Sequence, residues 1–139
     1  MIGHCLCGAC TVTVRHHGGF TGACHCRMCQ RWSGAIYVSL PAEAPDVEVA
    51  GPVVRYRSSD FAERAFCGTC GSHLWFRDLA EGSQYGLMPG LFDEARGIPL
   101  QSEIYVDRAL PGLALAGDHR RATRDEYEAK NLHLKGDMP

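Results

Sequence analysis

The sequence has no run of apolar residues approaching the roughly 20 that a membrane-spanning helix requires, and its first residues, MIGHCLCG, lack a basic stretch followed by an apolar one. It also lacks an excess of basic charge, because 14 lysines and arginines face 16 aspartates and glutamates, for a net charge of -2. A positive field that would draw the chain to phosphate backbones is therefore missing. We expect a soluble, cytoplasmic protein that binds neither membranes nor nucleic acid.

Internal repeats longer than the cysteine pairs, low-complexity tracts and a convincing interdomain linker are also missing. With 139 residues, 45% of them hydrophobic, the chain can build one modest core. We therefore predict a single domain over residues 1–139, whose segment 116–139 forms a C-terminal extension with a short polar helix.

Short segments of alternating, β-branched character dominate the rest of the chain, and they predict a mostly β fold. Pro41 is expected to stop the predicted strand at 35–40. The polar segment TRDEYEAKN at 123–131 is the clearest helical pattern. The predicted strands are 11–14, 35–40, 47–52, 53–57, 74–76, 85–88 and 104–106.

Cysteine is the residue type that stands out, with eight in a short chain. In a reducing compartment such a set is more typical of metal binding than of disulfides. Seven of the eight fall in tight groups, which favour several thiolates converging on one ion: Cys5-x-Cys7, Cys24-x-Cys26-x-x-Cys29 and Cys67-x-x-Cys70.

A structural zinc is usually enclosed by four ligands, often two pairs from distant turns. Cys5 and Cys7 would pair with Cys67 and Cys70 in such a site, stapling the N-terminal strand to the middle of the chain and adding folding free energy that a small β domain needs.

The middle group can wrap one side of an ion unaided, because Cys24, Cys26 and Cys29 lie within six residues. Three protein ligands plus an open position is the arrangement of a catalytic zinc, whereas Cys10 as a fourth ligand would make a second closed, structural site. Three thiolates would leave the zinc centre at about -1, which suits the activation of a thiol better than the splitting of water.

The motifs Gly3-His-Cys-Leu-Cys-Gly-Ala9, Cys24-His-Cys-Arg-Met-Cys-Gln-Arg-Trp-Ser-Gly34 and Phe66-Cys-Gly-Thr-Cys-Gly-Ser72 together resemble the glutathione-dependent formaldehyde-activating enzyme family. The resemblance covers about residues 3–115. It implies an Mss4-like fold, which is a small zinc-stapled β-sheet domain with two zinc ions. The structural zinc would bind the set of four cysteines given above, and the catalytic zinc would bind the set of three. It also implies carbon-sulfur lyase chemistry between a small carbonyl and a small thiol such as glutathione.

Four neighbouring residues keep two interpretations each. His25 could shuttle protons beside the open site, or point away from it because side chains alternate along an extended segment. Cys10 could be a buried apolar residue rather than a ligand. Arg27 and Arg31 could grip carboxylates of a peptide-like thiol, or be ordinary surface residues. The alternative for the whole chain is a non-catalytic, zinc-stapled module that binds a protein partner.

Overall fold

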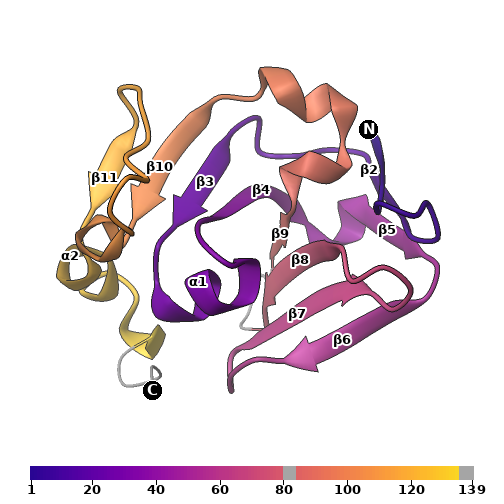
Figure 1. The fold of residues 1–139 in the computed structure, drawn as a ribbon, viewed down its shortest axis with the longest axis horizontal. Helices are drawn as coiled ribbons and strands as arrows, with labels where there is room; N and C mark the ends of the chain where they lie inside the picture. Colours follow the sequence, from indigo (N-terminus) through magenta and orange to yellow (C-terminus); the bar gives the residue numbers. More distant parts are fainter. Residues whose placement is uncertain (80–83, 135–139) are drawn as a thin grey trace. The chain divides into compact units, whose positions relative to one another are not determined.

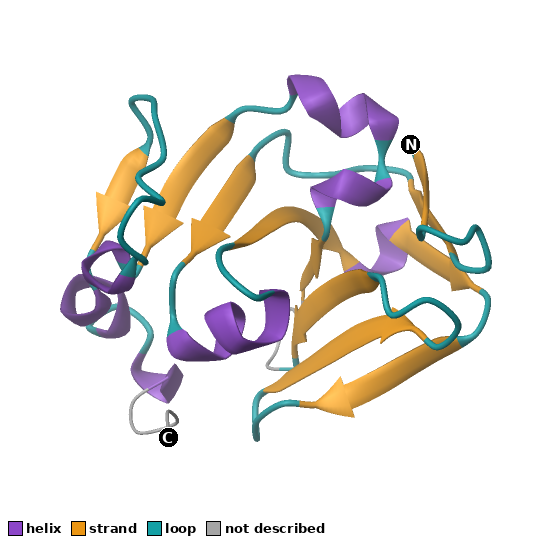
Figure 2. Cartoon of the chain, in the orientation of Figure 1, coloured by secondary structure: helices purple, strands orange, loops and turns teal. Residues whose placement is uncertain are grey.

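The computed structural model describes residues 1–79 and 84–134, of which 39% are strand and 22% helix, so the prediction of a mostly β fold is confirmed (Figure 2). The chain divides into two compact units. The first unit comprises Met1–Thr21 and Ser39–Pro99, and the second comprises Gly22–Val38 and Leu100–Pro139. The single domain over 1–139 stays a prediction, and the last five residues of the predicted extension lie outside the described residues.

One sheet of the first unit has three antiparallel strands in the order β1-β2-β5: β1 (Ile2–His4), β2 (Thr11–Val14) and β5 (Val47–Ala50). The alternation seen in the sequence of β2 sets its two faces. Val12 and Val14 are at most 1% exposed, whereas Thr11 and Thr13 lie at intermediate depth.

The other strands of the first unit form an antiparallel meander, in which each strand pairs with the next in space (Figure 1). In spatial order they are β4 (Tyr37–Glu43, of which this unit holds Ser39 onward), β9 (Gln84–Leu87), β8 (His73–Asp78), β7 (Ala62–Cys67) and β6 (Val53–Arg57). The first unit also contains three short 3-10 helices, η1 (Ala44–Asp46) between β4 and β5, and η2 (Pro89–Leu91) and η3 (Asp93–Gly97) after β9.

Proline 41 does not end its strand, contrary to the prediction for 35–40, because β4 continues to Glu43. Pro41 lies opposite Gly86 of β9, and its carbonyl accepts a hydrogen bond from the Gly18 amide at 2.9 Å. A proline is tolerated within a strand where the ladder does not need its missing amide proton.

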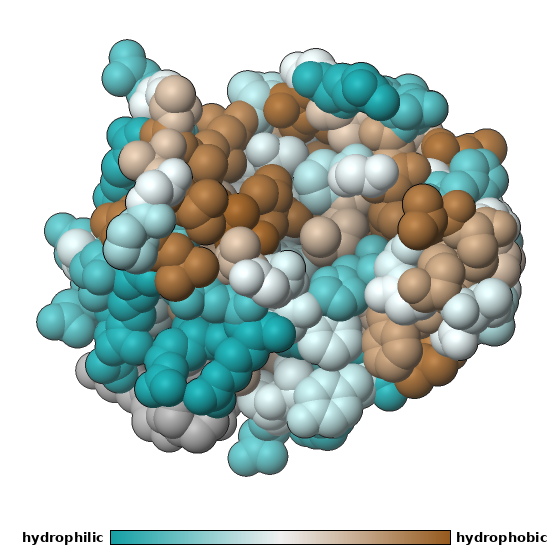
Figure 3. Space-filling model, in the orientation of Figure 1, coloured by the Kyte–Doolittle hydropathy of each residue, from teal (hydrophilic) through white to brown (hydrophobic). Residues whose placement is uncertain are grey.

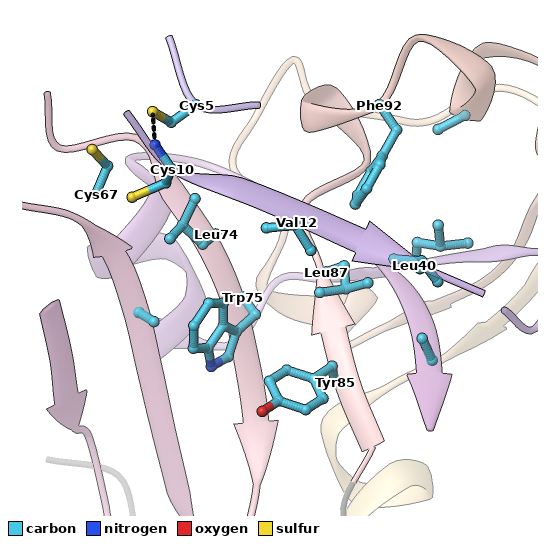
Figure 4. Packing of buried hydrophobic residues seen from close by; sticks show 14 residues of the cluster. Cys5, Cys10, Val12, Leu40, Cys67, Leu74, Trp75, Tyr85, Leu87 and Phe92 are labelled. Atoms are coloured by element: carbon cyan, nitrogen blue, oxygen red, sulfur yellow. Dashed lines mark hydrogen bonds between the residues drawn. The ribbon is translucent and has the colours of Figure 1, made fainter. Parts of the chain in front are cut away.

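The hydrophobic core of the first unit gathers side chains from both sheets (Figure 4). Trp75 is fully buried, and its ring meets Tyr85 edge-on with centroids 5.4 Å apart. Figure 4 also shows Cys10 beside Cys5 and Cys67 at one end of this core, so the first cysteine group is anchored in packed structure.

The second unit contains β3 (Thr21–Cys24), β10 (Leu100–Ile104) and β11 (Arg120–Ala122) as neighbouring strands, with β10 and β11 parallel. Its helical elements are α1 (Arg27–Ser33), η4 (Val106–Arg108), α2 (Arg124–Glu128) and η5 (Leu132–Leu134). Figure 1 shows α1 following β3 directly.

Helix α1 is absent from the sequence prediction, although its ends carry recognisable signals. Cys26 is its N-cap, with a sulfur that accepts the Cys29 amide at 3.4 Å, and Gly34 ends it with a φ of 83°. Because cysteine is not among the common N-cap residues, the sequence did not indicate where this helix begins.

The other differences lie toward the C-terminal end of the second unit. The strand predicted at 104–106 instead ends at Ile104, because Tyr105 takes a left-handed conformation (φ 57°) and turns the chain into η4. The predicted helix at 123–131 is confirmed but shorter, over Arg124–Glu128, with Thr123 and Glu126 forming a capping box. No helix in the described part of the chain is both long and apolar enough to cross a membrane.

Candidate metal centres

The sulfur atoms of Cys5, Cys7, Cys67 and Cys70 all lie within 4.8 Å of one another, in the first unit. Cys5 Sγ is 3.6 Å from Cys7 Sγ, and Cys7 Sγ is 3.9 Å from Cys67 Sγ. Four sulfurs at about 2.3 Å from a tetrahedral zinc would stand about 3.8 Å apart. The four side chains therefore fit a closed zinc site.

Two tight turns present these sulfurs. The Gly8 amide donates to the Cys5 carbonyl at 3.0 Å, and the Gly71 amide donates to the Cys67 carbonyl at 2.8 Å. Both glycines have positive φ, 77° and 75°, which explains why glycine follows each cysteine pair. Ser72 joins the turns, because its hydroxyl accepts the Leu6 amide at 3.0 Å.

Hydrogen bonds around the group divide its thiols into two kinds. The Ser72 hydroxyl lowers the pKa of Cys70 to about 5, and the Cys70 amide lowers the pKa of Cys67. The Ala9 amide favours the Cys7 thiolate, but hydrogen bonding to Cys70 together with burial raises the Cys7 pKa to about 11. The surroundings thus favour the thiolates of Cys67 and Cys70 but not that of Cys7, and a bound cation would favour the Cys7 thiolate as well.

Cys10 lies next to this group without belonging to it. Its side chain is fully buried, and its amide donates to Cys5 Sγ at 3.2 Å (Figure 4). Burial raises the pKa of its thiol to about 12. This position agrees with the interpretation of Cys10 as a buried apolar residue.

The sulfurs of Cys24, Cys26 and Cys29 form the second group, which lies in the second unit and is also contained within 4.8 Å. Amide protons point at two of them: Cys26 N–H donates to Cys24 Sγ at 3.5 Å, and Cys29 N–H donates to Cys26 Sγ at 3.4 Å. Hydrogen bonding to the other two thiols, followed by burial, raises the pKa of Cys24. No fourth cysteine, histidine or acidic side chain completes this group among the described residues.

His25 lies between Cys24 and Cys26. Its side chain is 1% exposed, and its Nε2 lies 2.6 Å from Glu103 Oε1. The opposite oxygen of Glu103 lies 2.7 Å from His119 Nε2 and 3.2 Å from Arg121 Nε. Burial opposes ionisation of Glu103, but hydrogen bonds from His119 and His25 outweigh it, so its pKa is lowered. This position fits the alternative in which His25 is not a proton shuttle.

A second buried carboxylate supports Tyr105, the residue with the left-handed backbone. The Tyr105 hydroxyl donates to Glu128 Oε1 at 3.0 Å, and Arg124 Nε donates to the same oxygen at 2.9 Å. Burial and the bond to Glu128 raise the pKa of Tyr105, to which the charges of Cys26 and Cys24 also contribute. A residue with a left-handed backbone that is held by a buried carboxylate and interacts electrostatically with Cys24 and Cys26 is the kind of feature that clusters at functional sites.

A shallow pocket of about 250 Å³ lies along α1, lined by Arg27, Gln30, Arg31, Gly34 and Leu110. Both arginines are exposed, and the surface over α1 is strongly hydrophilic (Figure 3). Gln30 is fixed, because its amide donates to the carbonyls of His25 and Arg108, each at 2.7 Å. The pocket therefore opens beside the helix that carries Cys29.

Sequence reasoning found all seven clustered cysteines but missed Glu103, Tyr105, His119 and Glu128. The Glu103–His25 contact joins residues 78 positions apart, and no local pattern connects them. Tyr105 lay within the predicted strand 104–106 and Glu128 within the predicted helix 123–131, but neither pattern indicated a functional role.

Comparison with known proteins agrees with this geometry. The pattern of the glutathione-dependent formaldehyde-activating enzyme family matches residues 1–108, so the chain belongs to that family, as its three motifs indicated. An uncharacterized lyase of Schizosaccharomyces pombe is 29% identical over 106 residues, which are 76% of this chain and 77% of the relative. A crystal structure of a Rhodobacter sphaeroides protein matches 73% of this chain and all of its own, at 26% identity and a TM-score of 0.59.

Proposed function

We propose that the protein is a zinc-dependent carbon-sulfur lyase that acts on a small thiol and a small carbonyl compound, with formaldehyde and glutathione as the first pair to test. The observation that carries this proposal is the contrast between two thiol groups, one of four and one of three. The family to which the chain belongs and the lyase named among its relatives support the class of reaction.

In this proposal Cys5, Cys7, Cys67 and Cys70 hold a structural zinc, and Cys24, Cys26 and Cys29 hold a catalytic one. A zinc ion on three thiolates would supply an open position at which a thiol is held as thiolate near neutral pH. The protein's own contribution is to fix the sulfurs of Cys24 and Cys26 through amide hydrogen bonds and to position the two substrates.

The reaction is balanced without an oxidant or reductant. The thiol loses its proton to solvent, and its sulfur forms a bond to the carbonyl carbon. The carbonyl π electrons move to the oxygen, which then takes up a proton from solvent. The product is a hydroxymethyl thioether when the carbonyl compound is formaldehyde, and the reverse reaction breaks the same carbon-sulfur bond.

Cobalt substitution tests whether the three-cysteine site is open. Cobalt bound there is expected to change its visible spectrum when glutathione is added, because a fourth thiolate joins the metal, whereas cobalt at a closed four-thiolate site is not expected to respond. Titration of the cobalt protein with glutathione, with S-methylglutathione as the control that lacks a free thiol, makes the measurement. An unchanged spectrum with both would contradict the proposal and favour a protein-binding module.

The arginine pocket along α1 supports a thiol that carries carboxylates. Arg27 and Arg31 lie one helical turn apart on an exposed face, where two like charges repel and an anionic group would relieve that repulsion. Cys29 lies on the buried side of the same helix, so a thiol whose carboxylate is held on this exposed face would have to extend around α1 to reach the three sulfurs.

Replacing both arginines with glutamine is therefore expected to raise KM for glutathione about tenfold, equivalent to about 1.4 kcal/mol of binding free energy, with a small effect on kcat. Steady-state kinetics with glutathione and with cysteamine, a thiol without carboxylates, checks this result. KM for cysteamine should stay within about twofold. The control is Arg120→Gln, an exposed arginine of the same unit. An equal rise for both thiols would show that the pocket does not recognise carboxylates.

A further inference from the structure

Residue 25 is held at three points, which is unusual for a residue in a connecting segment. Its amide donates to the Ile104 carbonyl at 3.1 Å, its carbonyl accepts the Gln30 side-chain amide at 2.7 Å, and its ring is 2.6 Å from Glu103. The backbone of His25 is therefore tied to β10 and α1, and its ring is tied to a buried carboxylate.

The three contacts of His25 affect metal binding because of where His25 lies in the sequence. The backbone torsions of His25 lie directly between Cys24 and Cys26, so they largely set how far apart the two sulfurs stand and how they face one another. A site with three protein ligands has no fourth ligand to correct a misplaced sulfur, so it depends on the surrounding structure for its geometry.

Glu103 is itself firmly fixed. Its side chain is 4% exposed and contacts His25 through one oxygen and His119 and Arg121 through the other. Another nitrogen of Arg121 donates to the carbonyls of Leu115 and Gly117, at 2.8 and 3.1 Å. A buried carboxylate with every partner in place has little freedom, because movement would leave a charged group unpaired.

We propose that Glu103 is a positioning residue, which holds the His25 ring and thereby fixes Cys24 and Cys26 in the geometry that retains the catalytic metal. The proposal rests on the proposed function insofar as Cys24, Cys26 and Cys29 must bind zinc. His25 and Glu103 bind neither metal nor substrate in this role. Glu103 contacts His25 through one oxygen and His119 through the other, and His119 lies outside the cysteine segment. Substitution of His119 is therefore a matched control for substitution of His25.

The test compares His25→Ala with His119→Ala in the full-length, zinc-loaded protein. The readouts are the rate at which a chelator removes the more labile zinc and the unfolding temperature. His25→Ala is expected to release that zinc about tenfold faster than the parent, whereas His119→Ala should stay within about twofold even if both variants unfold at similarly lowered temperatures. His25→Gln, which can return an N–H to the carboxylate, should bring the rate back to within about threefold of the parent.

Equal acceleration in both alanine variants, or none in either, would overturn the positioning role and leave Glu103 a purely structural residue. Should either alanine variant be unfolded at the assay temperature, Glu103→Asp takes its place and must show the same acceleration. A parent protein that releases only one zinc, even after zinc is added back, would instead overturn the proposed function, and the positioning role with it. Two zinc phases in the parent with unchanged rates in every variant would overturn the positioning role alone.

Discussion

Cys67→Ser is expected to abolish cooperative unfolding of the protein at room temperature. Cys67 is fully buried, and its sulfur belongs to the group that joins the N-terminal turn to the end of β7. A structural zinc contributes an apparent binding free energy of about 10–16 kcal/mol, which is as large as the whole stability of a typical domain, about 5–15 kcal/mol. A site reduced to three thiolates and a serine hydroxyl should lose most of that contribution.

Thermal unfolding followed by circular dichroism, together with elemental analysis for zinc, measures this effect. Cys10→Ala is the matched control, because Cys10 is also fully buried beside Cys5 and Cys67 but lies outside the four-cysteine group. It should cost about 1–2 kcal/mol through lost packing and leave the zinc content unchanged. A Cys67→Ser protein that melts like the parent with its full zinc content would remove the structural assignment of this group.

Cys24→Ser should have the opposite profile, a large loss of activity with the fold retained. Cys24 is partly exposed and belongs to a group confined to a six-residue segment, so its loss breaks no connection between distant parts of the chain. Zinc is expected to fall from two ions to one per chain. Thiol-dependent consumption of formaldehyde should fall by at least about 100-fold, since loss of a ligand should cost more than the 10- to 100-fold typical of residues behind the ligands.

Elemental analysis, circular dichroism and the kinetic assay are made on the same preparations, with zinc added back before the count. Cys10→Ala serves again as the control, this time for activity, and should keep most of it. If Cys24→Ser unfolded as completely as Cys67→Ser, the three-cysteine group would be structural and the enzymatic proposal would lose its main support.

Local chemistry could be predicted well from the sequence. The alternation in Thr11–Val14 predicted a strand with buried valines, and the tight cysteine spacing predicted two groups of thiols that the structure brings together. The strand and the spacing within each cysteine pair or triplet depend on neighbours within a few residues, where the geometry of a strand or a turn leaves few choices. The pairing of the first and last cysteine pairs across 60 residues followed instead from the four ligands that a closed zinc site requires.

Long-range and unusual features could not be predicted. The left-handed conformation of Tyr105, which moves the end of β10 and starts η4, is supported by Glu128 from a later helix. The partner of His25 lies 78 residues away. Helix α1 was missed because a cysteine, rather than a serine or aspartate, caps its first turn. For Tyr105 and His25 a long-range contact decides the local structure, whereas for α1 the local signal is an uncommon one.

Under the proposed two-zinc function, the order of the cysteines along the chain has a consequence for metal loading. The segment with Cys24 and Cys26 lies inside the loop that Cys7 and Cys67 close, so during folding Cys7 meets those nearer thiols first. Closing a loop of about 17 residues costs about 1.1 kcal/mol less entropy than closing one of about 60, which favours mixed ligation in an unfolded chain. Correct metal loading would therefore require early formation of the β7–β8 hairpin, which presents Cys67 and Cys70 together before the first turn binds metal with other thiols.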